Sequence, residues 1–155
     1  MKTIIVQNRQ KMIILSAFIL SMLLFSTCKI ILVSSYDDKI ADQIENVSKS
    51  IDKFYLTMLE TTTEVNGGRV YSKFAEQYVA IEVELQSLLN KNKARTKNEE
   101  TIKICEKTIS LFEKYKNEHK KENTINDTDI TLNLNNMRRM LNPLIISEKA
   151  KKMAE

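Results

Sequence analysis

The sequence has few of the residues that make tight turns. Among its 155 residues there are two glycines and one proline, and there is no tryptophan. Sandwiches and barrels need many turns, and glycine and proline supply most of the tight ones. Their scarcity argues against an all-β fold and predicts a few long helices joined by short loops.

The residues of common catalytic and metal sites are also missing. The only histidine is His119, and Lys116 stands three residues before it, so the Glu-x-x-His pairs of di-metal helix bundles are absent. The chain has neither a C-x-x-C-H haem motif nor a G-x-S-x-G nucleophile elbow, and it has no glycine-rich phosphate loop. We therefore predict that the protein is not an enzyme and holds no metal and no cofactor.

Two single residues have simple structural interpretations. Cys105 lies on the apolar stripe of a predicted helix, which indicates a small core residue, and we expect no disulfide between Cys28 and Cys105. His119 lies near the end of the same helix, where we expect it to face solvent or to interact with the helix end. An enzymatic hypothesis would need Cys105 and His119 within hydrogen-bond reach of each other.

The net charge of +4 does not indicate nucleic-acid binding. Residues 1–27 contain three basic residues and no acidic one, so without them 21 basic residues would face 20 acidic ones. The remaining charges of both signs are interspersed, as on a solvated helical surface. We predict no nucleic-acid partner.

The N-terminal segment has the order of a secretory signal peptide. The basic start "MKTIIVQNRQK" is followed by an apolar run from Met12 to Phe25. Fourteen helical residues measure about 21 Å, which is short of a hydrocarbon core of about 30 Å. The following "FSTC" resembles a bacterial lipobox, although Phe25 and Thr27 replace its usual leucine and small residue. This predicts a signal peptide over residues 1–27, lipid attachment at Cys28 and a tether over residues 28–35.

Two other interpretations of this segment stay open. If Lys29 snorkels, residues 12–33 form about 33 Å of helix, which is enough for an uncleaved membrane anchor. Alternatively, small residues at "VSS" allow ordinary signal cleavage after Ser35 and release of a soluble protein. All three interpretations place residues 36–155 in the cell envelope or beyond it, outside the cytoplasm, and the first two make the membrane a partner.

The exported part is predicted to be an all-α, antiparallel up-down four-helix bundle over residues 36–155. Apolar residues recur at alternating steps of three and four over residues 40–58, 71–88, 102–112 and 130–144. Each segment is thus a helix with one apolar stripe, and short connections favour antiparallel neighbours.

Local motifs suggest where these helices begin and end. Capping boxes are predicted at Ser35–Asp38 and at Thr96–Glu99, and the glycine pair in "VNGGR" predicts a break between the first two helices. Pro143 is expected to kink the last helix rather than to end it, because the apolar stripe continues beyond it.

Two sets of residues are candidates for binding. Tyr71, Phe74 and Tyr78 share a stripe that is either core or a groove for an apolar small molecule or a partner helix. A cavity lined by Tyr71, Phe74 and Phe112 would favour ligand binding, and a filled core would favour an interaction or structural role. A basic run is either a solvated loop or a patch for anionic lipid head groups or another envelope polymer; its residues are Lys91, Lys93, Arg95 and Lys97.

The chain resembles a group of small bacterial lipoproteins of unassigned activity. The resemblance rests on the leader that ends in cysteine, "YDD" shortly after it, Asn98 with Thr101, His119, and the final "EKAKK". It implies an envelope location and a helical architecture. We therefore predict a membrane-anchored, non-enzymatic interaction or structural module, with a helical ligand-binding protein as the alternative.

Overall fold

The computed structural model describes residues 33–154, which form an all-α structure of four long helices and two short 3-10 turns without a strand. The signal peptide, the lipid attachment at Cys28 and the anchor helix predicted above lie outside these residues. The elements are α2 (Asp38–Thr61), η1 (Val65–Gly67), η2 (Tyr71–Lys73), α3 (Ala75–Lys93), α4 (Glu99–Glu122) and α5 (Asp127–Ala154).

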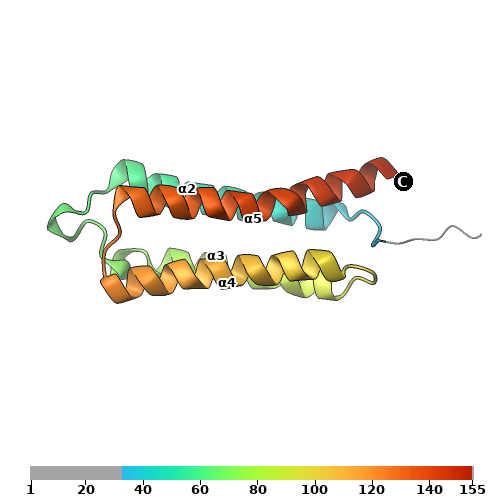
Figure 1. Ribbon diagram of the computed structural model, residues 1–155, viewed down its shortest axis with the longest axis horizontal. Helices are drawn as coiled ribbons and strands as arrows, with labels where there is room; N and C mark the ends of the chain where they lie inside the picture. Colours follow the sequence, from blue (N-terminus) through green and yellow to red (C-terminus); the bar gives the residue numbers. More distant parts are fainter. Residues whose placement is uncertain (1–32, 155) are drawn as a thin grey trace, which may run out of the picture. The chain divides into compact units, whose positions relative to one another are not determined.

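The four helices form an antiparallel up-down bundle, as predicted (Figure 1). Helix α2 packs against α3 and α5, and α4 packs against the same two helices, so successive helices are neighbours and α5 closes the ring on α2. Short connections produce this arrangement because each helix reverses the direction of the one before it.

The predicted stripes make the core. Burying one such aliphatic side chain stabilises the fold by about 1.5–3 kcal/mol. A single helix can bury its stripe only against the other helices, so no single helix is expected to be stable without them. The largest fully buried side chains are Ile44, Ile51, Tyr55 and Met58 of α2, Tyr78, Leu85 and Leu88 of α3, Phe112 of α4, and Ile130, Met137, Leu141 and Leu144 of α5.

Both predicted capping boxes are wrong. The residue that caps α2 is Asp37, whose carboxylate accepts a hydrogen bond from the Ile40 amide at 3.1 Å. Helix α4 begins at Glu99 after Asn98, and the Asn98 side chain makes no capping hydrogen bond. The side-chain amide of Asn98 is engaged elsewhere, in the site described below.

The break at "VNGGR" is confirmed, but the next helix begins later than predicted. Asn66 and Gly67 take positive φ angles of 55° and 66°, the left-handed conformation that glycine and asparagine tolerate best. A Cβ on Gly68 would lie 2.1 Å from the Thr63 carbonyl oxygen, so only glycine fits there. Tyr71 lies in the η2 turn, and α3 begins after Phe74. The prediction placed the helix start too early because the apolar spacing continues through this turn, which is not α-helical.

Helix α5 runs through Pro143 to Ala154 and does not end at Asn142. Its C-terminal part bends away from the direction of its first turns (Figure 1). A proline removes one helical hydrogen bond and is a common cause of such a bend. The last two turns of α5 lie at the end of the bundle at which residue 33 enters (Figure 1), and Lys151 contacts Ser34 there.

Candidate functional site

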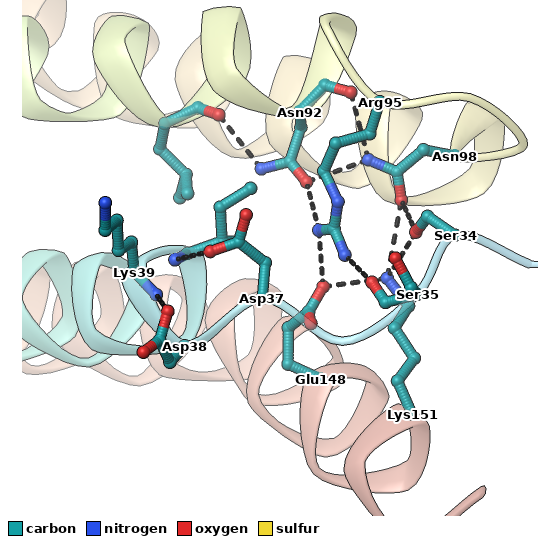
Figure 2. Close-up of polar contacts among 12 residues, drawn as sticks. Ser34, Ser35, Asp37, Asp38, Lys39, Asn92, Arg95, Asn98, Glu148 and Lys151 are labelled. Atoms are coloured by element: carbon teal, nitrogen blue, oxygen red, sulfur yellow. Dashed lines mark hydrogen bonds and ion pairs between the residues drawn. The ribbon is translucent and has the colours of Figure 1, made fainter. Parts of the chain in front are cut away.

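A cluster of buried polar side chains joins the start of the folded chain to one end of the bundle (Figure 2). We call it the polar clasp. It comprises Ser34, Asn92, Arg95, Asn98, Glu148 and Lys151, all of which are buried except Arg95, which is half-buried. These residues come from the segment before α2, the end of α3, the α3–α4 loop and the last turns of α5.

Glu148 is the centre of the clasp. Its side chain is 2% exposed, and its Oε1 accepts hydrogen bonds from Arg95 Nη1 at 2.6 Å and Lys151 Nζ at 2.7 Å. A buried charge is tolerated only when it is paired, and here two cations share one carboxylate. Removing Glu148 would leave two cations without a counter-charge, whereas removing one cation would leave the carboxylate paired with the other.

Ser34 is bound on both its backbone and its side chain. Its amide donates to the Lys97 carbonyl at 3.0 Å. Its hydroxyl donates to Asn98 Oδ1 at 2.9 Å and accepts from Lys151 Nζ at 3.0 Å, since an ammonium group can only donate. Arg95 also donates to the carbonyl of Ser35. Residues 34 and 35 are therefore fixed to the bundle.

Two asparagines extend the clasp into the core. Asn98 Nδ2 donates to Asn92 Oδ1 at 2.8 Å and to the Asn92 carbonyl at 3.0 Å. Asn92 Nδ2 donates to the Leu88 carbonyl at 2.9 Å and lies 3.9 Å from Cys105 Sγ. Burial raises the pKa of the Cys105 thiol to about 11, so this free cysteine is a core residue, as predicted, and a poor nucleophile.

A second polar cluster lies at the opposite end of the bundle, around His119. The prediction that His119 faces solvent or interacts with the helix end is wrong, because its side chain is 2% exposed and contacts Arg69 and Tyr78 instead. Its Nε2 lies 2.8 Å from the Arg69 carbonyl oxygen and its Nδ1 lies 3.1 Å from the Tyr78 hydroxyl. A carbonyl can only accept, so we assign the proton to Nε2, and Tyr78 donates to Nδ1. Burial lowers the pKa of His119, consistent with a neutral ring.

Arg69 holds the loops at this end together. Its side chain is 3% exposed and donates to the Thr62 carbonyl at 2.8 Å, the Ile125 carbonyl at 3.3 Å and the Asp127 carboxylate. It thus connects the end of α2 to the start of α5. Sequence reasoning missed Arg69 because it lies in a loop without periodic spacing.

Phe74 and Tyr78 of the aromatic stripe are core residues, and Tyr71 is half-buried and packs against the core. The Tyr78 ring packs against Phe54, Phe112 and Tyr71 at centroid distances of 4.7, 5.6 and 5.7 Å. Phe74 and Phe112 are also buried, at 8% and 0% exposure. Side chains therefore fill the space in which a ligand between Tyr71, Phe74 and Phe112 would lie.

The basic run is divided by the fold. Arg95 turns inward to Glu148, and Lys93 forms a half-exposed ion pair with Glu106 at 3.1 Å. Lys91 and Lys97 are exposed. The run is therefore not one continuous basic patch.

In residues 33–154, neither the metal-site arrangement nor the Cys105–His119 pair considered above is present. No group of three or more histidine, cysteine and acidic residues is placed to hold a metal in this part of the chain. The side chain of His119 contacts Tyr78 and the Arg69 carbonyl, and that of Cys105 contacts Asn92, so the Cys105–His119 pair that an enzymatic hypothesis needed is not formed. Among the helices of the described region, none is long and apolar enough to cross a membrane.

Comparison with known protein families, curated proteins and solved structures finds no match for this chain.

Proposed function

We propose that the protein is an exported, membrane-anchored helical module of a bacterial cell envelope. It carries no enzymatic activity and acts through contacts with other envelope components or as a structural element. The N-terminal sequence supports export, since a basic start, an apolar run and a lipobox-like "FSTC" follow one another in the order of a lipoprotein signal.

The observation that carries the proposal is the attachment of Ser34 and Ser35 to the bundle. The Ser34 hydroxyl serves both Asn98 and Lys151, and the Ser35 carbonyl accepts from Arg95. Cleavage after Ser35 would leave buried polar groups of the bundle without the Ser34 hydroxyl and the Ser35 carbonyl. Each group left unsatisfied would lower the free energy of unfolding by about 1–3 kcal/mol. This cost favours the two anchored forms over a soluble form that begins at Tyr36.

Of the two anchored forms, we propose lipidation at Cys28. The shorter apolar run, from Met12 to Phe25, ends just before the lipobox-like segment and needs no lysine inside the membrane. Each buried CH₂ of an acyl chain contributes about 0.8 kcal/mol, so two or three chains hold a domain of this size on a bilayer. The packed aromatic stripe supports an interaction or structural role over ligand binding.

The test is the intact mass of the protein extracted from the membranes of a bacterial host. We expect the mass of residues 28–155 plus acyl chains. The Cys28→Ala variant should lose the acyl mass and the processing, whereas Cys105→Ala, the matched change at the other cysteine, should keep both.

Other masses distinguish the alternatives. An unprocessed, membrane-bound wild type would overturn lipidation and leave an uncleaved anchor. A soluble product that begins at Tyr36, or a chain that remains in the cytosol, would overturn the proposal as a whole.

A further inference from the structure

The end of the bundle that carries the polar clasp also presents exposed apolar and basic side chains. We call it the anchor end and define it as residues 33–36, residues 94–98 and residues 146–154 of α5. We propose that the anchor end lies against the bilayer and binds anionic phospholipid head groups through Lys149 and Lys152, with Met153 inserted between them. This inference rests on the proposed membrane anchor and adds which face of the bundle meets the membrane and which lipid it prefers.

Chain connectivity puts the anchor end close to the membrane. Ser34 follows Cys28 by six positions. At no more than about 3.6 Å per residue, the chain between them can span roughly 20 Å. An uncleaved anchor helix would end at Val33 and bring the same point still closer. Because Lys151 bonds directly to Ser34 at 3.0 Å, the last turns of α5 share this position. The clasp therefore prevents the bundle from turning freely on residues 34 and 35.

The exposed side chains of this surface are those of a membrane interface. Met153 is 83% exposed, and Ile146, seven residues earlier and hence on the same helical face, is 57% exposed. Val33, where the folded chain begins, is 56% exposed. Apolar residues flanked by lysine are typical of surfaces that rest in the head-group region, where the apolar part enters and the ammonium groups stay at the phosphates.

The two lysines of this surface are available for an anionic partner. Lys149 and Lys152 are exposed, and neither takes part in an ion pair of the described chain. Glu45, whose carboxylate is close enough to feel the charge of Lys149, is paired with Lys49 at 2.6 Å. Lys152 lies over the ring of Tyr36 at 5.3 Å, and tyrosine is itself enriched at membrane interfaces.

The experiment is a lysine-acetylation footprint of the full chain, read by mass spectrometry. The chain is placed in zwitterionic detergent micelles, in phosphatidylcholine vesicles, and in phosphatidylcholine vesicles that contain phosphatidylglycerol. Flotation of the vesicles first establishes anchoring. We expect the anionic vesicles to slow acetylation of Lys149 and Lys152 by about fivefold, the factor for one basic residue at an anionic surface. Lys120 and Lys121, the exposed pair in the last turn of α4 at the opposite end, are the internal control and should react equally in all three.

A matched pair of variants tests the apolar contact. Met153→Ser should reduce the protection of Lys149 and Lys152, whereas Val65→Ser, which changes a 70% exposed apolar residue at the opposite end, should leave it intact. High salt should remove the protection without releasing the anchored chain.

The outcomes separate this inference from the proposed function. A chain that floats with the vesicles but shows the same acetylation of Lys149 and Lys152 in anionic vesicles and in micelles overturns the inference and leaves the anchor standing. A chain that does not float overturns the anchor and this inference with it.

Discussion

Arg95 and Glu148, which lie 53 positions apart in the sequence, meet inside the anchor end with 2.6 Å between Arg95 Nη1 and Glu148 Oε1. The pair joins the α3–α4 loop to the last turns of α5, and Lys151 completes it from the other side. Arg95 also donates to the Ser35 carbonyl, so the pair connects the segment before α2 to the same place. Hydrogen bonds therefore join the segment before α2 directly to this end of the bundle.

We predict that Glu148→Gln destabilises the protein by about 3–5 kcal/mol, because Arg95 and Lys151 would remain buried without their carboxylate. The free energy of unfolding is measured on the full chain in detergent micelles, by chemical denaturation followed by circular dichroism. The control is Asp52→Asn, which breaks the more exposed ion pair with Arg138 and should cost under about 1 kcal/mol. Equal losses in the two variants would show that the clasp is not a buried charge cluster.

Two adjacent serines allow a test of the tether attachment. Ser34→Ala removes a hydroxyl that bonds Asn98 and Lys151, and we expect a loss of about 1–3 kcal/mol in the free energy of unfolding. Ser35→Ala keeps the carbonyl to which Arg95 donates, and its effect should stay within about 0.5 kcal/mol. Hydrogen exchange of the Ser34 amide gives a second measurement, since that amide should exchange faster in Ser34→Ala only. A neutral Ser34→Ala would mean that the tether is not fixed by its side chain.

The helices could be predicted from the sequence because each stripe is a local pattern. Steps of three and four residues identify one face of a helix regardless of what packs against it. The same rule failed at Tyr71 and Phe74, since a 3-10 turn can continue the apolar spacing into a segment that is not α-helical. His119 carried an overlooked signal: it follows Phe112 by seven residues and Cys105 by fourteen, which places it on the buried stripe of α4.

The polar clasp could not be predicted in this way. The hydrogen bonds that join its separate segments span 53 to 117 positions, and no local spacing encodes them, although Glu148–Lys151 and Asn92–Asn98 are three and six positions apart. Ser34, Asn92 and Asn98 are residue types that favour turns and helix caps, so on their own they indicate helix boundaries. Only the assembled bundle brings them around Glu148.

The pH dependence of stability follows from His119. Its pKa is lowered in the folded state by burial, so the unfolded chain binds more protons as the pH falls below the ordinary histidine value of about 6.5. We therefore expect the free energy of unfolding to be constant above that value and to decrease as the pH falls through it. The measurement is chemical denaturation at a series of pH values between neutral and mildly acidic.

The sole histidine makes this prediction easy to check. In His119→Gln the decrease between neutral and mildly acidic pH should disappear, although the variant is less stable throughout. If the free energy of unfolding of the wild type instead rises as the pH falls through this range, the imidazole is charged in the folded state and the assignment of its proton is wrong.

Tyr55 and Tyr78 are both fully buried but differ in whether the hydroxyl has a hydrogen-bond partner. The Tyr78 hydroxyl donates to His119 Nδ1 at 3.1 Å, whereas the Tyr55 hydroxyl, equally buried, has no hydrogen-bond partner among the residues that the structure describes. Tyr78→Phe should lower the free energy of unfolding by about 1–3 kcal/mol, because it leaves a buried imidazole nitrogen unsatisfied. Tyr55→Phe removes an unsatisfied polar group and should raise it by about 1 kcal/mol. Denaturation of both variants under one condition gives the comparison, and a loss of stability in Tyr55→Phe as large as that in Tyr78→Phe would contradict the contrast between the two sites.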